Sequence, residues 1–430
     1  MPPVSASAPS ARTRFNPKNA GGDSVFMKKS NFLWVRNIRL PDGTTGDILA
    51  RRGSKKENSS ILRIGVLTDA DRVLCAGAEV FDAAGLRAAP AFVDLSCRPD
   101  RAGNGNALSD ETLSAVCGGF GTVLSLDADD ASGIAARKRR ADSYGRCRVL
   151  CTGRLGSVGD AGQALRLKER GAFALTDYGT PSSDTEGVLR AMLAAAEAGL
   201  PVIAECRDAS FGNSVPAVSE ELAAARSILL ARETGCRLHL TGVSTAGTLS
   251  LIRKAKDAGI PVTCDVTQMA FSCTEEELLY VGTQAKLLPP LRARSDAEAV
   301  ISAIRDGTVD CVTSGHTPCT RSEKELPMKD AVPGAVGFQT LFGAGMTWLV
   351  LKNIIPLHRW LTLISAAPAE ILGLKAELRE GGSADFVLFS PEEEWTVTRE
   401  LLRGRSSCTP LLGVSLHGAV RRTVLNGELM

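Results

Sequence analysis

Long apolar runs, net charge and histidine are absent or scarce in this sequence, and each limits the classes of protein to which the chain can belong. No run of about 18 apolar residues occurs, so no transmembrane helix is expected. Lysine and arginine (50) nearly balance aspartate and glutamate (48), and a formal charge of +2 favours neither nucleic acid nor a membrane as partner. Histidine is rare, with four in 430 residues, so few ligands are available for a zinc site.

The cysteines and the first 30 residues bear on the compartment. Twelve cysteines occur without close C-x-x-C pairs, mostly in apolar stretches, and we expect buried free thiols in a reducing cytoplasm. Residues 1–30 are rich in Pro, Ser and Ala, carry five basic residues against Asp23 alone, and lack the apolar core of a signal peptide. We predict a disordered basic tail over 1–30, and an organellar transit peptide is the alternative.

Both ends of the chain carry short alternating segments typical of β-strands. We expect one small β-sandwich built from residues 31–88 and 381–430. The predicted strands are Phe32–Leu40, Gly46–Ala50, Ile61–Leu67, Ala78–Asp82, Ala384–Ser390, Glu394–Val397 and Val420–Asn426.

Between the two ends, apolar strands alternate with helices. Eight such units in about 220 residues indicate an α/β fold, a (β/α)8 TIM-type barrel over residues 89–380. The predicted strands are 91–95, 119–126, 148–152, 171–176, 201–206, 236–241, 261–266 and 309–314. The clearest helices are Thr185–Ala198, Ser219–Glu233, Ala246–Ala258 and Ser295–Asp306, and Gly337–Asn353 is apolar enough for a buried helix.

The first barrel strand carries the most specific motif. Residues 90–100 read Pro-Ala-Phe-Val-Asp-Leu-Ser-Cys-Arg-Pro-Asp. This stretch resembles the P-G-F-V-D-L-H-x-H-x-R motif of the dihydroorotases and their cyclic-amidohydrolase relatives in the amidohydrolase superfamily. Ser96 and Arg98 replace the two histidines, and Asp100 replaces the substrate-binding arginine. The resemblance covers nearly everything from residue 31 to the end of the chain.

In that family the resemblance implies a zinc ion at the strand ends, whose bound water attacks the cyclic amide. Several further positions differ from the family's motifs. Ala128 replaces a substrate-binding asparagine, Glu205 and Gly242 replace metal-binding histidines, Gly315 replaces the aspartate that is ligand and acid/base, and Cys319 replaces the last histidine. The remaining polar residues at the strand ends are Asp94, Asp177, Glu205, His239, Asp265 and His316.

These replacements predict no catalytic residue, no metal and no cofactor. The first hypothesis is therefore a catalytically inactive dihydroorotase homologue, a pseudoenzyme. The resemblance alone implies its partner: it would be a structural or regulatory subunit of aspartate carbamoyltransferase in pyrimidine biosynthesis, and itself a homo-oligomer. Neither nucleic acid nor membrane is expected as a partner.

The alternative hypothesis is a divergent metal-dependent cyclic amidohydrolase. A rebuilt mononuclear zinc site would use Glu205, His239, His316 and an aspartate, with Cys97 and Cys319 as soft ligands. The opposing interpretation is that Asp177 and Glu205 pair with Arg98 or Arg207, so that arginine–carboxylate pairs replace the metal's charge. A third hypothesis, a scaffold for another partner, depends only on the basic tail.

Overall fold

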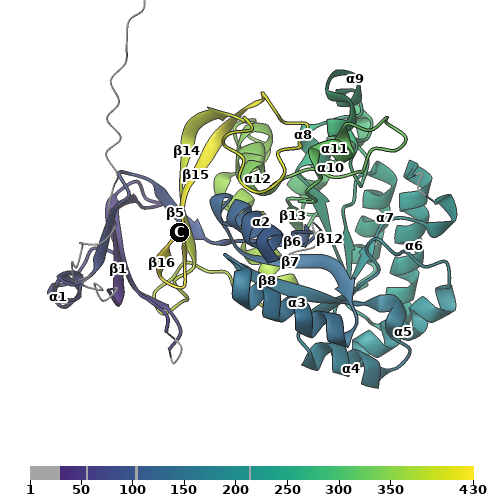
Figure 1. The fold of residues 1–430 in the computed structure, drawn as a ribbon, viewed down its shortest axis with the longest axis horizontal. Helices are drawn as coiled ribbons and strands as arrows, with labels where there is room; N and C mark the ends of the chain where they lie inside the picture. Colours follow the sequence, from purple (N-terminus) through teal and green to yellow (C-terminus); the bar gives the residue numbers. More distant parts are fainter. Residues whose placement is uncertain (1–29, 55–56, 102–104, 213–214) are drawn as a thin grey trace, which may run out of the picture.

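The computed structural model describes residues 30–54, 57–101, 105–212 and 215–430. The predicted tail lies, apart from Ser30, outside the described residues. The described chain builds one sheet of eight strands and two sheets of four strands. In Figure 1 the eight-stranded sheet and its helices form the larger part of the molecule, and the sheet that contains β1 stands to one side.

The eight-stranded sheet is the predicted barrel. All neighbouring strands are parallel and follow one another in chain order. They are β6 (Phe92–Cys97), β7 (Phe120–Asp129), β8 (Arg148–Arg154), β9 (Ala172–Thr176), β10 (Val202–Glu205), β11 (Leu238–Thr241), β12 (Val262–Thr267) and β13 (Cys311–Thr313). A parallel bridge between Cys97 and His316 joins the end of the first strand to the segment after the last. The predicted α/β TIM-type fold is confirmed.

Helices cover the outside of this sheet. The main ones are α2 (Gly105–Cys117), α3 (Ala131–Tyr144), α4 (Ala161–Glu169), α5 (Thr185–Ala198), α6 (Ala217–Thr234), α7 (Ala246–Asp257) and α10 (Arg294–Asp306). Side chains of Asp130, Asp160 and Asp184 accept backbone N–H groups at the starts of α3, α4 and α5. Helices α5 and α6 end at Gly199 and Gly235, whose left-handed φ angles of 66° and 65° suit glycine.

The predicted buried helix over Gly337–Asn353 is α12 (Phe338–Gly345) followed by a π-helical turn, η4 (Met346–Val350). Two more helices follow, α13 (Leu357–Ile364) and α14 (Ala366–Ile371). Ala367 and Ile371 of α14 pack against the barrel-interior side chains of Leu95, Leu124 and Leu150. Helix α14 therefore closes the end of the barrel at which the strands begin, the barrel floor. Shorter turns are η1 (Leu155–Ser157), η2 (Ala209–Phe211), α8 (Met269–Ser272), α9 (Glu277–Val281), η3 (Gly282–Ala285) and α11 (Arg321–Lys324).

The two ends of the chain build two four-stranded sheets. One contains β1 (Phe32–Arg39), β2 (Thr45–Arg51), β3 (Ser60–Gly65) and β4 (Glu79–Asp82); the other contains β5 (Arg87–Pro90), β14 (Phe386–Thr396), β15 (Ser415–Leu425) and β16 (Glu428–Leu429). Strand β5 and helix α1 (Asp69–Cys75) were not predicted, and the two strands predicted over 384–397 are the single strand β14. Leu33, Ile48, Phe386 and Val424 share one core. The exact domain boundaries stay a prediction.

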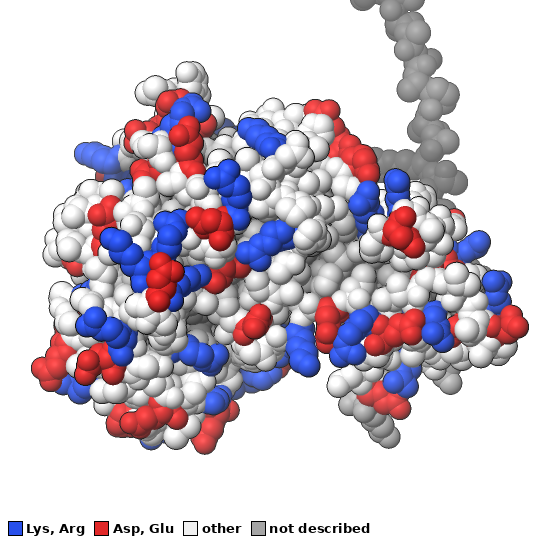
Figure 2. Space-filling view, turned by 180° about the vertical axis from the view of Figure 1, so that it is seen from behind, with Lys and Arg blue, Asp and Glu red and all other residues white. Residues whose placement is uncertain are grey.

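The surface and the thiols agree with the composition. Figure 2 shows Lys and Arg intermixed with Asp and Glu over the visible face. No helix in the described part of the chain is long and apolar enough to cross a membrane. All twelve cysteines are free, and ten are buried. Burial raises the pKa of the Cys147 thiol to about 12, which keeps it protonated and unreactive.

Candidate functional site

The carboxyl ends of the barrel strands carry the polar residues that the sequence singles out. They are Asp94 and Ser96 on β6, Asp177 after β9, Glu205 on β10, Asp265 on β12 and His316 after β13. His239, the second residue of β11, lies nearer the amino ends of the strands, where it lines a cavity. In barrels of this kind the reaction centre lies at the carboxyl ends of the strands. The structure brings these residues to one region, but it holds them in separate pairs rather than in one cluster.

Arg98 follows the first strand and pairs with Asp127 at the end of the second. The distance from Nε to the carboxylate oxygen is 2.7 Å. The guanidinium also lies 5.9 Å from the centre of the Tyr178 ring, within range of a cation–π contact. The expected pairing of Arg98 with an acid is observed, but the acid is Asp127 and not Asp177 or Glu205. Positive charge therefore occupies the position of the family's second histidine.

Asp100, at the position of the family's arginine, faces two arginines of helix α3. Arg137 lies 2.8 Å and Arg140 2.6 Å from its carboxylate oxygens. Ala128, at the position of the family's asparagine, offers only its carbonyl oxygen, which accepts a hydrogen bond from Arg154 at 3.1 Å. The charge at Asp100 is thus opposite to that of the family's arginine and is neutralised by two arginines of this chain.

Glu205 is the carboxylate that lines the mouth of the barrel. It accepts hydrogen bonds from Arg207 Nε at 3.0 Å and from the Gly179 backbone N–H at 2.8 Å. Asp177 in turn accepts the Glu205 backbone N–H at 2.8 Å, and burial raises the pKa of Asp177 to about 6. The expected pairing of Glu205 with Arg207 is observed, whereas Asp177 binds backbone instead of a guanidinium.

His239 is fully engaged inside the barrel. Its Nε2 lies 2.9 Å from Asp265 and its Nδ1 2.9 Å from the Thr263 hydroxyl. The second Asp265 oxygen accepts the Gly242 backbone N–H at 2.9 Å. Gly242 has a φ of +70°, and a Cβ there would lie 3.1 Å from Pro289. A histidine at this position would therefore require Pro289 to move.

His316 points away from the mouth, into the helical layer. Its Nε2 lies 3.0 Å from the buried Glu111 carboxylate, and its Nδ1 accepts the Gly337 N–H at 3.3 Å. The ring stacks on Phe338 with 3.9 Å between centroids. His316 is thus a neutral structural histidine, whose Nε2–H donates to Glu111.

Asp94 joins the first strand to the last. Its two oxygens accept the backbone N–H groups of Ser96 at 2.7 Å and Ser314 at 3.0 Å. Burial raises the pKa of Asp94 to about 7, so this carboxyl titrates near neutrality. Burial also raises the pKa of the thiols of Cys97 and Cys319, so neither is a thiolate ready for a metal.

A cavity of about 20 Å³ remains at the strand ends, between Ser96, Glu205 and Thr241 and a roof formed by Leu288 and Pro289. Within the described residues the Thr241 hydroxyl oxygen is buried without a hydrogen-bond partner. A water-sized space beside a free hydroxyl and a carboxylate is suited to one ordered water. This form of the site therefore accommodates a water but not a ring.

The side chains at the strand ends do not fit a zinc ion. Over the described ranges, with their three internal gaps, no three His, Cys, Asp or Glu side chains gather where they could hold a metal. Glu205, His239 and His316 instead have different partners, namely Arg207, Asp265 and Glu111. The mononuclear site of the alternative hypothesis is not formed by these residues.

Three residues of the site were not found from the sequence: Asp127, Glu111 and Thr241. An available signal was the acidic run that begins at Asp127, followed by the basic cluster Arg137–Arg140 one helix later. Charges of opposite sign on a strand end and on the next helix can meet above the sheet. Glu111 and Thr241 gave no such signal, because their importance depends on burial.

Comparison with known proteins finds dihydroorotases and hydantoinases that are similar to this chain. No family model matches the chain. It is 31% identical over 412 residues to a protein named dihydroorotase from Caldanaerobacter subterraneus subsp. tengcongensis, covering 89% of this chain and 95% of the relative. It is 32% identical to the dihydroorotase of Aquifex aeolicus, with 87% and 93% covered. Among solved structures, the L-hydantoinase of Arthrobacter aurescens matches with a TM-score of 0.80 at 22% identity, covering 92% and 95%.

Two predictions are corrected by these relatives. The prediction that the chain is not an enzyme is wrong, because relatives that carry an enzyme's name match it at about 31% identity over nearly its whole length. The prediction of no cofactor is wrong on the same ground, because it conflicts with the zinc that the resemblance implies for this family. Within the described residues, however, the side chains at the strand ends do not form a zinc site.

Proposed function

This chain belongs to the dihydroorotase family, and from that premise we propose that it is a divergent cyclic amidohydrolase that opens a dihydroorotate-like ring in pyrimidine biosynthesis. The observation that carries the proposal is the 31–32% identity to proteins named dihydroorotase across about nine-tenths of the chain. The retained barrel, with its polar strand ends, supports the same conclusion.

The reaction adds one water across the ring C–N bond. In the proposed site Glu205 takes the proton of a water held beside Thr241, and the oxygen of that water bonds to the carbonyl carbon. The C–N bond then breaks, and the ring nitrogen receives the proton from Glu205. Arg207 orients the carboxylate at 3.0 Å. Because the cavity is only about 20 Å³, the Leu288–Pro289 roof must withdraw to admit the ring.

The test uses the purified full-length chain with dihydroorotate and hydantoin as substrates, assayed with and without added Zn²⁺. The ring-opened acids are separated chromatographically. We expect turnover that Glu205→Gln lowers about 100-fold or more, as for loss of a general base. Glu186→Gln is the matched control, because Glu186 is also paired with an arginine but lies on the exposed surface of α5. The absence of turnover of either ring under both conditions would contradict the proposal.

We also propose that the chain associates with the catalytic chain of aspartate carbamoyltransferase and with further copies of itself. The resemblance suggests these partners, and one surface feature supports a protein contact. Leu279 and Tyr280 on α9 are 83% and 84% exposed, and α9 projects from the barrel (Figure 1). A partner that covers these two side chains would remove their apolar surface from water, which favours association.

The mass in solution of the mixed proteins, compared with each alone, tests this association. We expect a large stoichiometric complex that the double variant Leu279→Ser/Tyr280→Ser weakens. Val73→Ser changes an equally apolar, 75% exposed side chain on α1 and should leave the complex intact. Two separate peaks for the wild-type mixture would refute the association without bearing on ring hydrolysis.

A further inference from the structure

Two cavities flank helix α14 on the barrel floor, opposite the candidate active site. The larger, about 560 Å³, lies beneath the amino ends of β10, β11 and β12 and against α13 and α14. A space of this size is typical of a site for a small organic ligand. The floor of such a barrel ordinarily serves stability rather than chemistry, so an open space there calls for an explanation.

The walls of this floor cavity are largely apolar, and its charged lining residues are Arg237, Arg359, Asp310 and Glu370, of which Asp310 is paired with Lys256. Ile260, Val262 and Ile371 contribute aliphatic surface. Arg237 and Arg359 line the same cavity. Arg237 donates to a backbone carbonyl, and Arg359 has no hydrogen bond or ion pair to any described residue. Arg237 is exposed, whereas the Arg359 guanidinium is partly buried and without an ion pair among the described residues, so Arg359 can bind a carboxylate, sulfonate or phosphate.

The floor cavity reaches a buried chain of hydrogen bonds that ends at the active-site mouth. Thr263 and His239 line the cavity. Thr263 contacts His239 at 2.9 Å, His239 contacts Asp265 at 2.9 Å, and Asp265 accepts the Gly242 N–H at 2.9 Å. Gly242 lies against Pro289 of the roof. A ligand that moves the Thr263 hydroxyl would therefore change contacts at the opposite end of the barrel.

We propose that the floor cavity binds a small organic anion with an apolar body, and that its occupancy is transmitted through His239 and Asp265 to the strand-end site. The anionic group meets Arg359 and Arg237, and the apolar body lies against Ile260, Val262 and α14. This role uses groups that ring hydrolysis at Glu205 does not require, so the two proposals stand or fall separately.

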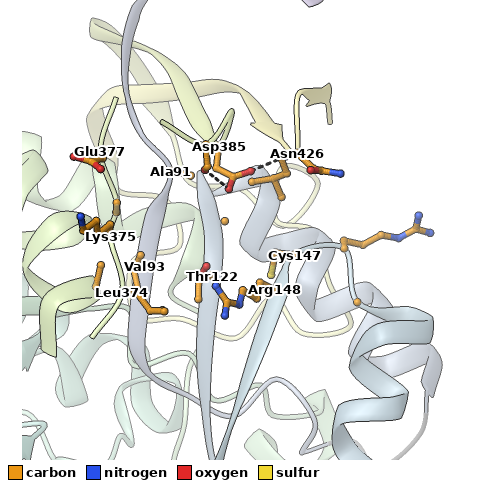
Figure 3. A pocket seen from close by; sticks show the side chains of 17 residues that line it. Ala91, Val93, Thr122, Cys147, Arg148, Leu374, Lys375, Glu377, Asp385 and Asn426 are labelled. Carbon is orange, nitrogen blue, oxygen red and sulfur yellow. Dashed lines mark hydrogen bonds between the residues drawn. The ribbon is translucent and has the colours of Figure 1, made fainter. Parts of the chain in front are cut away.

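The second floor cavity, about 490 Å³, is also lined by basic residues, Arg146, Arg148 and Lys375, but it does not reach His239 or Thr263 (Figure 3). It lies under β6–β8 and the C-terminal sheet. Asp385 there accepts the Asn426 N–H and, through its carbonyl, the Ala91 N–H, while Glu377 pairs with Arg379. Its acids already have partners within the chain, and none of these contacts leads to the strand ends. We therefore assign the ligand to the cavity beneath β10–β12.

The experiment titrates the full-length chain, labelled with ¹⁵N-histidine, with 1-anilinonaphthalene-8-sulfonate, an apolar aromatic anion. Four histidines give a spectrum simple enough to assign. We expect saturable binding that shifts the His239 ring signals and leaves those of His417 unchanged. Arg359→Gln should weaken binding about tenfold or more, as for loss of one charge-assisted hydrogen bond. Thr362→Phe, which fills the mouth of the cavity, should abolish binding of the probe.

Arg305→Gln is the matched control, because it removes an exposed arginine of α10 that does not line the cavity. It should bind the probe as the wild type does, and so should Glu205→Gln, whose change is confined to the strand ends. If Arg359→Gln and Thr362→Phe bind with wild-type affinity, the probe binds elsewhere and the proposed site is wrong. Saturation without any movement of the His239 signals would overturn the link to the strand ends.

Discussion

Asp177 offers the sharpest test of the electrostatics at the strand ends. One of its oxygens accepts the Glu205 N–H at 2.8 Å, and its side chain borders a cavity of about 250 Å³. Asparagine can keep that hydrogen bond with its carbonyl oxygen and turn its NH₂ group toward the cavity. Asp177→Asn therefore removes a buried charge with little change in shape.

The expected effect depends on pH. Burial raises the pKa of Asp177 from 3.8 to about 6. Below pH 3.8 the carboxyl is protonated in both the folded and the unfolded chain, so its contribution to stability is fully present. As the pH rises toward 6, the unfolded chain loses the proton first, and this contribution is lost. About two units at 1.36 kcal/mol each amount to roughly 3 kcal/mol.

We therefore expect Asp177→Asn to match the wild type near pH 4 and to exceed its free energy of unfolding by up to about 3 kcal/mol at pH 7. Urea denaturation of both proteins at several pH values measures the difference. Asp184→Asn, which changes an exposed helix cap on the next segment, is the control and should change stability by only a few tenths of a kcal/mol, because asparagine caps a helix about as well as aspartate. A difference between wild type and Asp177→Asn that stays constant from pH 4 to 7 would refute the reasoning.

Three further predictions concern the pairs that fill the site. Glu111→Ala should lower the free energy of unfolding by about 3 kcal/mol in a denaturant titration, because the buried His316 Nε2–H loses its acceptor. The control Asp110→Ala, on the exposed side of α2, should lower it by under about 1 kcal/mol. Equal losses for the two variants would contradict this prediction. Gly315→Asp, which restores the family's aspartate, should destabilise the folded chain by about 2 kcal/mol, because φ is +61° and its Cβ would lie 2.9 Å from the Thr267 methyl group. Adding Thr267→Ser to this variant should recover part of the lost stability in thermal melts. The absence of any recovery would exclude that contact as the cause. Arg98→Met should cost about 1–2 kcal/mol in urea by leaving Asp127 without its 2.7 Å partner, and unchanged stability would mean that the pair is solvent-screened.

The site differs from its family's motif in which charged residues it carries. After the first strand, Arg98 places a positive charge where the motif has a histidine, and Asp100 places a negative charge where it has an arginine; Asp127 and Arg137 neutralise these charges. The similarity to its relatives places the chain in the dihydroorotase family, whereas the side chains at its strand ends differ from those of the family's motif. The assays with and without zinc test whether the chain hydrolyses a cyclic amide with these groups.

The sequence by itself determined the barrel, because apolar strands and amphipathic helices alternate with a spacing that only parallel strands with outer helices satisfy. It also determined which positions differ from the family motif, since residue identity at a strand end needs no coordinates. It missed α1 and β5, because segments of seven and four residues carry little periodic signal. The split of 384–397 into two predicted strands failed because the pairing of β14 with β15 continues across an irregular register.

Only the tertiary structure decided which acid each cation meets. Asp127 and Arg98 are 29 residues apart, and His316 and Glu111 are 205 apart, so no local pattern could pair them. Burial likewise decided that Asp94 and Asp177 titrate near neutrality, because the cost of charging a carboxyl depends on the water it has lost and not on its neighbours in sequence. The floor cavity beneath β10–β12 arises in the same way, from segments that meet only when the barrel closes on α14.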